Sequence, residues 1–508
     1  MRDLLVAALL WFNWVVITYA VVVAGTQLLL MGAAGLHILR TMRRDVASRM
    51  DDVFAHPGTP AVSVLIPAFN EERTIVESVL SVLALRYPEL EVIVVDDGST
   101  DATFAVLEKA FGLVEVPRAI PADLPTRGAV RSVHCPQDGG PLVVIRKENA
   151  KRCADALNVA LNAARSPLVC MVDADSVIEP EALLHVVRPF VEQPDSVVAA
   201  GGVIRPSNGL RLRRGSVESV SAPPGLLALA QAVEYLRAFL FGRVGWTWLN
   251  GVLIISGAFA VFRRDLVMKV GGMNADSLGQ DAELVAALHL SLRKERVDYR
   301  MVIVPQPVCW TEVPGSWQDL GGQRRRWSQG LVQVLWRYRS AFGRPRFGRF
   351  GLLILPYHLL FELLGPVVEV LGVPVVLAAS ALGLLDGEFA LLAFALSVGF
   401  GVMLSLVAVF LDEVTFHRYE RWRDLGLLMA AALFESTCLR WVHSVWRVRG
   451  LFDAVNPRAK EWGTIARAGF RTGHDARATA DDADADDAEA DDAEADDARL
   501  VAAGGPES

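Results

Sequence analysis

Long apolar runs and shorter alternating runs divide the chain into distinct regions. Residues 4–38 contain no Asp, Glu, Lys or Arg, and apolar character returns over residues 350–383 and 388–411. A helix needs roughly 20 apolar residues to cross the hydrocarbon core of a bilayer. The pattern therefore predicts three transmembrane helices, one near the N-terminus and two in the C-terminal half.

The charges beside these runs predict the topology. Four arginines, Arg40, Arg43, Arg44 and Arg49, follow the first apolar run, and basic residues collect on the cytoplasmic side of a membrane. A cleaved signal peptide would be shorter and would carry its basic residues in front. We therefore expect a multi-pass protein of the plasma membrane, with its N-terminus outside and the chain in the cytoplasm from residue 50 onward.

The run 350–383 is neither continuous nor purely apolar. Gly365-Pro366 interrupts its helical pattern, and Glu362 and Glu369 lie within it. A carboxylate in hydrocarbon is costly, so we expect these glutamates to face a polar path or a partner. Alternatively, they satisfy backbone groups that the helix break loosens.

The segment 425–447 allows two interpretations. Residues 427–434 are apolar, whereas residues 435–449 alternate apolar and basic side chains at helical spacing. A fourth spanning helix would place the basic stretch 440–450 outside, against the charge rule. We therefore expect the second half to be an amphipathic helix at the membrane surface.

A soluble domain is predicted between the first two spans. Within residues 60–204, β-rich runs alternate with helical patterns. The runs are 62–69, 90–97, 141–149 and 167–175, and the helical patterns include 71–85 and 154–164. This alternation predicts a doubly wound, mostly parallel α/β sheet, whose ligands bind beyond the carboxyl ends of the strands.

Polar residues at the ends of the first two strands are candidates for binding a nucleotide. Pro67, Asn70 and Glu71 end the first strand, and Asp96 and Asp97 end the second. Carboxylates at this edge can hold the base or ribose of a nucleotide. Asp-Gly-Ser-Thr is also an ordinary turn and helix cap, so both interpretations stay open.

The fourth predicted strand ends in two aspartates, Asp173 and Asp175, one residue apart. Two hard carboxylates at this spacing can hold a divalent cation, which neutralises the oxygens of a diphosphate. The pair alone is a common pattern. Its position at the same edge as Asp96 and Asp97 strengthens the prediction of a metal site.

Two further segments carry candidate residues. Ser256 and Gly257 are small and would let the backbone lie close to a sugar, although close packing explains them equally well. Asp281 precedes a helical pattern, where an aspartate is usually an N-cap. The residues themselves do not decide between a structural and a chemical role.

Composition separates the C-terminal tail from the rest of the chain. The 508 residues are 52% apolar and carry a formal charge of −8. Residues 475–508 hold 13 acidic and 2 basic side chains, so the remainder is near +3. We expect the Asp-Ala repeat of 474–508 to be disordered rather than to bind metal or a partner. The five scattered cysteines favour a reducing compartment.

The ordered motifs resemble one family. In sequence order they are Pro67–Glu72, Val94–Asp101, 172–176, 256–259, 279–284, 310–314 and 323–327. They look like those of the membrane-bound family 2 glycosyltransferases, which include cellulose, chitin, hyaluronan and, most similar here, poly-N-acetylglucosamine synthases. The resemblance covers roughly residues 5–470 and implies a GT-A fold between transmembrane helices.

The resemblance implies a role for each matching donor residue. Asp96 and Asp97 would contact the uridine of a nucleotide sugar, and Asp173 and Asp175 would hold the nucleotide and Mg²⁺ or Mn²⁺. Asp281 matches the general base that takes the proton of the acceptor hydroxyl. These roles make up an inverting, metal-dependent sugar transfer.

A Gln-x-x-Arg-Trp motif is implied to bind the donor diphosphate and the acceptor sugar. Gln323, Arg326 and Trp327 match it. Arg324 and Arg325 fall outside the motif, and we expect them to pair with lipid headgroups, with carboxylates or with water alone.

Two departures from the family pattern concern the donor site. Gln280 replaces the glutamate that usually precedes the base. The segment before Ala154 lacks the usual Gly-Gly-Lys, and Lys151 or Arg152 would take over the role of that lysine near the diphosphate.

These expectations define five regions and a function. The regions are a transmembrane helix with its basic flank (1–50), a cytoplasmic GT-A domain (51–340), transmembrane helices (341–424), an interfacial region (425–473) and the acidic tail (474–508). We expect a UDP-sugar, with UDP-N-acetylglucosamine first, to be polymerised into a β-linked polysaccharide. Expected partners are a glycan or lipid acceptor, membrane lipids and accessory export proteins, but no nucleic acid. Single transfer to a lipid and an inactive nucleotide-sensing or transport subunit are the alternatives.

Overall fold

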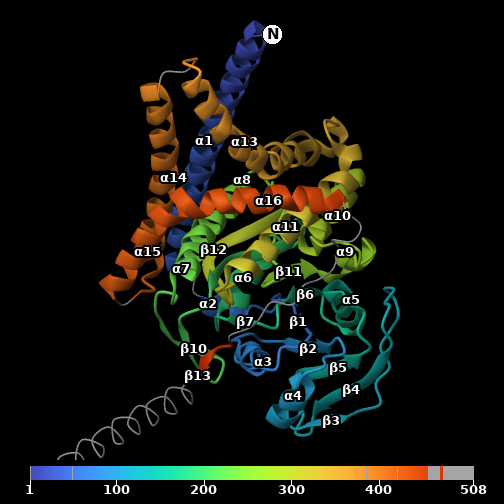
Figure 1. The fold of residues 1–508 in the computed structure, drawn as a ribbon. Helices are drawn as coiled ribbons and strands as arrows, with labels where there is room; N and C mark the ends of the chain where they lie inside the picture. Colours follow the sequence, from blue (N-terminus) through green and yellow to red (C-terminus); the bar gives the residue numbers. More distant parts are fainter. Residues whose placement is uncertain (1, 48–49, 385–386, 420, 456–468, 473–508) are drawn as a thin grey trace, which may run out of the picture.

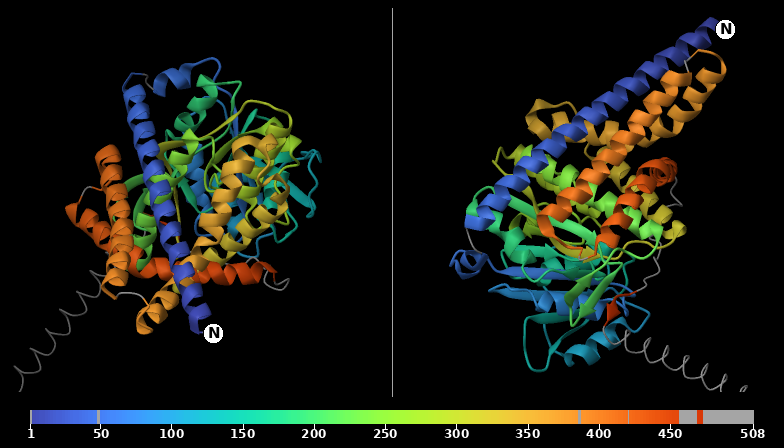
Figure 2. Two further views of the ribbon diagram at one scale, coloured as in Figure 1. Left: turned by 90° about the horizontal axis from the view of Figure 1, so that it is seen from above. Right: turned by 90° about the vertical axis from the view of Figure 1, so that its left-hand side faces the viewer.

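The computed structural model of the chain describes residues 2–47, 50–384, 387–419, 421–455 and 469–472. It consists of a sheet domain and a set of long helices that extend away from it on one side (Figures 1 and 2). The acidic tail predicted at 474–508 lies outside the described residues.

Four parallel strands form the centre of a ten-stranded sheet. They are β1 (Val62–Ala68), β2 (Leu90–Asp96), β5 (Leu142–Lys147) and β6 (Leu168–Met171), in the order β5-β2-β1-β6. These are the four β-rich runs predicted from the sequence, so that prediction is confirmed. Because the strands are parallel, their carboxyl ends meet at one edge.

Six more strands flank this centre. One side carries β3 (Leu113–Glu115) and β4 (Val130–Pro136); the other carries β11 (Ala260–Arg263), β8 (Val197–Pro206), β12 (Arg300–Thr311) and β7 (Ser176–Ile178). Of these, β4, β11 and β7 are antiparallel to their neighbours, and β8 and β12 pair in parallel, so the sheet is mixed but mostly parallel, as predicted. A small second sheet contains β9 (Leu210–Arg213), β10 (Ser216–Val220) and β13 (Arg471–Thr472).

Helices cover the sheet with their apolar faces. In α3 (Ile75–Leu83), Ile75, Val79 and Val82 recur at helical spacing and are fully buried, as expected for an amphipathic helix on a sheet. The others in this domain are α4 (Thr103–Phe111), α5 (Cys153–Ala163), α6 (Ala182–Glu192), α7 (Leu226–Leu236), α8 (Val244–Trp248), α9 (Arg264–Lys269), α10 (Gln280–Lys294) and the short α2 (Met50–Ala55).

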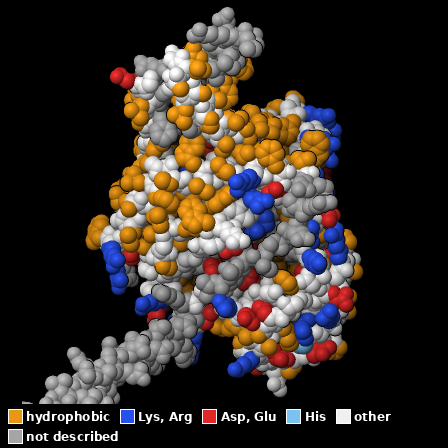
Figure 3. Space-filling view, in the orientation of Figure 1, with side chains coloured by type: hydrophobic (Ala, Val, Ile, Leu, Met, Phe, Trp, Pro, Cys, Tyr) orange, Lys and Arg blue, Asp and Glu red, His pale blue; other side chains and the backbone are white. Residues whose placement is uncertain are grey.

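Long apolar helices form the membrane part. α1 (Arg2–Ala47), α13 (Gly365–Ala381) and α14 (Gly387–Phe416) rise together from the sheet domain (Figure 1). Hydrophobic side chains predominate among those coloured by type on this part, whereas most charged ones lie below it (Figure 3). Within the described residues, four segments are long and apolar enough to cross a membrane: Trp14–Arg43, Phe350–Ala381, Ala395–Phe416 and Trp422–Val455. The chain is therefore a membrane protein.

The last of these segments does not continue in one direction. α15 (Trp422–Phe434) and α16 (Arg440–Val455) point different ways, and α16 runs across the base of the rising helices (Figure 1). α16 lies against α11 (Trp317–Arg337). A Cβ at Gly450 would lie 2.7 Å from Arg325 O, so the close contact needs a glycine. The surface location of α16 stays a prediction.

Several π-helical turns lie where the two parts meet. They are η1 (Arg237–Arg243), η4 (Phe350–Ile354), η5 (His358–Leu363) and η6 (Glu435–Leu439); the short η2 (Arg339–Ala341), η3 (Pro345–Phe347) and α12 (Leu355–Tyr357) lie between α11 and α13. π-helical turns are rare and often occur at functional sites.

The glutamates of the second apolar run have partners within the chain. Glu369 accepts hydrogen bonds from Arg440, at 2.5 Å, and from Ser444, at 2.6 Å. Glu362 Oε2 lies 2.9 Å from Arg447 Nη2. Because Arg440, Ser444 and Arg447 all belong to α16, ion pairs fasten this helix to the second apolar segment.

Candidate active site

The loops after β1 and β2 hold each other in place at the carboxyl edge of the sheet. Asn70 N donates to Ser99 Oγ at 3.0 Å, and Asn70 Oδ1 accepts from Thr100 N at 2.8 Å. Glu71 N donates to Thr103 Oγ1 at 2.8 Å. Asn70 therefore has a clear structural role, whatever its part in donor binding.

The two aspartates after β2 have different environments. Asp96 Oδ1 accepts a hydrogen bond from Ser99 N at 2.9 Å. This bond is the one expected if the motif forms a turn. Asp97 is buried and accepts a hydrogen bond from Lys147 Nζ. Burial raises the pKa of Asp97, and the Lys147 charge opposes that rise.

Lys147 is a residue of the candidate site that the sequence patterns did not indicate. Its ammonium is fully buried at the end of β5, bonded to Asp97 and 3.0 Å from Asp155 Oδ2. The sequence pointed instead to Lys151, whose side chain is exposed on a loop with a φ of 57°. The available signal was a lysine ending an apolar strand, because such a charge needs carboxylate partners.

Asp173 and Asp175 follow β6 and differ in exposure. Asp175 is buried and accepts from Thr311 Oγ1 at 3.2 Å. Asp173 is partly exposed and faces Gly257, where a Cβ would lie 3.9 Å from Asp173 Oδ1. Within the described residues, no three His, Cys, Asp or Glu side chains gather as a metal site. The pair fits a cation that takes its other ligands from phosphates and water, as Mg²⁺ does.

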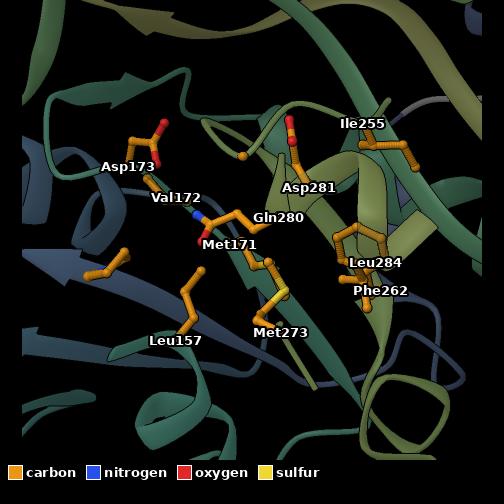
Figure 4. A pocket seen from close by; sticks show the side chains of 13 residues that line it. Leu157, Met171, Val172, Asp173, Ile255, Phe262, Met273, Gln280, Asp281 and Leu284 are labelled. Carbon is orange, nitrogen blue, oxygen red and sulfur yellow. The ribbon is translucent and has the colours of Figure 1, made fainter. Parts of the chain in front are cut away.

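One pocket brings several predicted residues together. Asp173 and Asp281 both line it, on opposite sides of Gln280 in the view of Figure 4. Pro67 and Gly257 also line this pocket. It therefore joins the carboxyl ends of β1 and β6 to the first turn of α10.

Asp281 is the second residue of α10, and its carboxylate bonds locally. Asp281 Oδ1 accepts from Ala282 N at 2.8 Å. Burial raises the pKa of Asp281, and Arg243 partly opposes that rise. A half-buried carboxylate with a raised pKa is suited to accept a proton.

The two segments that depart from the family pattern, the one before Ala154 and the one before Asp281, are in contact. The side chains of Cys153 and Gln280 are hydrogen-bonded, and burial together with the nearby Asp173 raises the pKa of Cys153 to about 12. The thiol is therefore neutral at physiological pH. Cys153, immediately before Ala154, and Gln280, immediately before Asp281, therefore form a neutral pair of side chains.

The two arginines of the cluster that fall outside the motif, Arg324 and Arg325, each pair with a carboxylate. Arg324 lies 2.7 Å from Glu234 Oε2, and Arg325 lies 2.6 Å from Asp453 Oδ2. Of the alternatives for these two arginines, the structure shows carboxylate partners. Arg326 is half-buried one residue before the exposed Trp327.

The remaining predicted residues lie on α11 and in the loop before β11. Gln323 has a buried Oε1 with no hydrogen-bond partner among the described residues. Ser256 Oγ accepts from Ala258 N at 3.4 Å. The pocket of Asp173 and Asp281 is not lined by five of the predicted residues, namely Lys151, Ser256, Gln323, Arg326 and Trp327.

Two family models match the chain. The model for glycosyl transferase family 2 matches residues 63–271, and the model for glycosyl transferase family group 2 matches residues 168–411. The two matches together extend from β1 into α14.

Individual relatives add detail. A poly-beta-1,6-N-acetyl-D-glucosamine synthase from Staphylococcus aureus is 25% identical over 303 residues, which cover 60% of this chain and 62% of the relative. The synthase of the same name from Staphylococcus epidermidis is 24% identical over 382 residues, covering 73% and 79%. The match thus spans less than two thirds of the S. aureus protein.

A solved structure supports the fold. A mannosyltransferase from Pyrobaculum calidifontis, in complex with GDP-Man and Mn²⁺, aligns with a TM-score of 0.50 at 21% identity, covering 83% of this chain and 98% of that protein. This similarity shows that the sheet domain has the GT-A fold. With its ordered motifs and both family matches, the chain belongs to the family 2 glycosyltransferases.

Proposed function

We propose that the chain transfers sugar units from a UDP-sugar to a growing β-linked polysaccharide at the membrane. One observation carries this proposal: Asp173 and Asp281 line the same pocket at the carboxyl edge of the sheet. A departing diphosphate needs its negative charge stabilised, and an acceptor hydroxyl needs a base for its proton. Asp173, as a ligand of a cation, is suited to the first role, and Asp281 is suited to the second.

Asp281 is the proposed general base. Its carboxylate takes the proton of the acceptor hydroxyl while that oxygen attacks the anomeric carbon of the donor. A base within hydrogen-bond reach contributes roughly 10²- to 10⁴-fold in rate. Attack from the face opposite the diphosphate inverts the anomeric centre, so an α-linked donor yields a β-linkage.

Asp173 and Asp175 are the proposed ligands of Mg²⁺ or Mn²⁺. A cation held there would supply charge stabilisation for the departing diphosphate. The geometry of Asp175 supports this role, because the Thr311 hydroxyl holds its carboxylate. Mn²⁺ accompanies GDP-Man in the Pyrobaculum mannosyltransferase of the same fold.

The nucleotide is proposed to lie over the loops after β1 and β2. Asp96 and Asp97 contact the uridine there, beside Pro67, Asn70 and Glu71. The Lys147 ammonium supports this assignment, since it keeps Asp97 in a fixed position. Lys151 is the proposed diphosphate contact from the loop before α5.

Residues of α11 are proposed to complete the site. Gln323 and Arg326 bind the diphosphate and the acceptor, and the exposed ring of Trp327 stacks on a sugar. Ser256 and Gly257 lie where a small side chain lets the acceptor approach. The buried, unpartnered Oε1 of Gln323 supports a ligand there.

The donor is proposed to be UDP-N-acetylglucosamine, since the Staphylococcus relatives are named for a polymer of that sugar. The catalytic domain lies in the cytoplasm of a cell whose plasma membrane holds the spanning helices. The polymer leaves past these helices, with accessory export proteins as partners.

A product assay tests this proposal. Purified protein with UDP-N-acetylglucosamine and Mn²⁺ should release UDP and form high-mass product that a glycosidase degrades. Product that extracts with lipid and stays small would instead support single transfer to a lipid. No UDP release from any UDP-sugar would contradict the proposal and favour an inactive subunit.

A further inference from the structure

Arg243 is a half-buried cation that the proposed chemistry does not yet use. It ends the π-helical turn η1, directly before α8. Its guanidinium carbon lies 3.9 Å from the centre of the Phe239 ring. This stacking holds the long side chain in one direction and leaves the planar donors at its edge available.

The donors of Arg243 are incompletely used. Its Nη1 is enclosed and has no hydrogen-bond partner among the described residues. A buried donor without a partner costs about 1–3 kcal/mol, more when it is charged. Such a group calls for an explanation, and a missing ligand is one.

Other arginines at the same junction are paired. Arg237, at the start of the same π-helical turn, lies 2.6 Å from Glu435 Oε1. Arg440 and Arg447 pair with Glu369 and Glu362. No carboxylate of the described chain lies within ion-pair distance of Arg243, so its open donor is not a general property of this interface.

Arg243 and the proposed base lie close enough for their charges to interact, although Arg243 is not among the residues that line the pocket of Asp281. Asp281 on α10, Tyr235 on α7 and Glu362 on η5 interact with it electrostatically. Burial lowers the pKa of Arg243, and Asp281 counteracts this. Arg243 is thus close enough to Asp281 to sense its charge but forms no ion pair with it.

We propose that Arg243 Nη1 donates a hydrogen bond to an oxygen of the acceptor sugar. This contact holds the acceptor hydroxyl against Asp281 from the membrane side. The acceptor is a neutral, hydroxylated glycan end, because an anionic group would also face the carboxylates of Asp281 and Glu362. The inference rests on the proposed function and names a residue for its acceptor.

The test separates acceptor binding from donor binding. Arg243→Gln and Arg243→Lys are assayed for UDP release from UDP-N-acetylglucosamine with and without a β-1,6-linked N-acetylglucosamine oligosaccharide. Arg243→Gln should lower kcat/KM for the oligosaccharide ~10- to 100-fold, the range for losing a charged hydrogen bond. Donor KM and Tm should stay near wild type, and Arg243→Lys should fall between.

A matched control is Arg339→Gln, since Arg339 also stacks on an aromatic ring, Trp336, but is exposed. It should behave as wild type. An unchanged oligosaccharide kcat/KM in Arg243→Gln would overturn the inference, as would an equal loss of donor binding. A loss seen only with vesicles containing a polyprenyl phosphate would overturn the neutral acceptor. Absence of UDP release by the wild type overturns the proposed function itself.

Discussion

The hydroxyl of Thr311 donates a hydrogen bond of 3.2 Å to Oδ1 of Asp175. Thr311 is the last residue of β12, opposite Ser176 of β7, so a neighbouring strand fixes the orientation of a proposed metal ligand. Thr311→Val should raise the Mn²⁺ concentration for half-maximal UDP release roughly tenfold, as losses of such supporting bonds do. At saturating Mn²⁺ the rate should recover.

The control for Thr311 is Thr437→Val, whose exposed hydroxyl bonds only within its own helix and to Cys438. Its Mn²⁺ titration should match wild type. An identical midpoint for Thr311→Val would show that Asp175 does not hold the cation through this geometry.

Lys147 should be essential for both stability and nucleotide binding. Lys147→Met leaves the buried carboxylates of Asp97 and Asp155 without their cation, which costs about 3–5 kcal/mol when one partner of a buried pair is removed. We expect a lower Tm and loss of UDP affinity in calorimetry. Lys147→Met with Asp155→Asn should recover part of the Tm.

Lys151→Met is the stability control, because exposed substitutions usually change stability by less than about 0.5 kcal/mol. It should keep the Tm, and it should weaken donor binding if Lys151 contacts the diphosphate. A Tm loss equal to that of Lys147→Met would contradict the assignment of the buried lysine.

The central strands could be predicted because each is an apolar run followed by polar turn residues. The pattern of apolar residues did not predict β8 as a strand, although all ten of its residues are buried. Gly201 and Gly202 weaken its strand pattern. The structure explains them, since a Cβ at these positions would meet Ile255 at 2.6 Å and Val308 at 2.4 Å.

Asp173 and Asp281 could be selected from the sequence because they belong to ordered motifs, and the structure brings them to one pocket. Lys147 and Arg243 were not found, because their partners are distant in sequence. Lys147 bonds to Asp97, 50 residues away. A role for Arg243 is indicated only by its Nη1, which has no partner among the described residues, and by its interaction with the charge of Asp281. Both depend on the folded structure.

The ion pair between Glu369 and Arg440 should stabilise the junction with α16. Glu369→Ala leaves Arg440 without its carboxylate, which should lower the Tm of the detergent-solubilised protein. Combining it with Arg440→Ala should cost less than the sum of the single variants, as expected for residues in contact. Additive losses would argue that the two side chains do not interact.

The acid side of the pH profile should report Asp281. Burial raises its pKa above the ordinary value, and only the deprotonated carboxylate accepts a proton. At saturating Mn²⁺, kcat/KM should therefore fall as pH decreases through the raised pKa and be retained above it. Arg243→Gln removes a charge that lowers this pKa, so its acid limb should lie at higher pH. A limb that does not move would contradict this coupling.

The most direct test of the account compares Asp281→Asn with wild type, using UDP release from UDP-N-acetylglucosamine and calorimetric UDP binding. The side chains are nearly equal in size, so fold and nucleotide binding should persist. If Asp281 is the base, UDP release should be almost completely lost, by at least about 100-fold, with unchanged UDP affinity. Near-normal turnover by Asp281→Asn would contradict the assignment of Asp281 as the base, and with it the proposed mechanism.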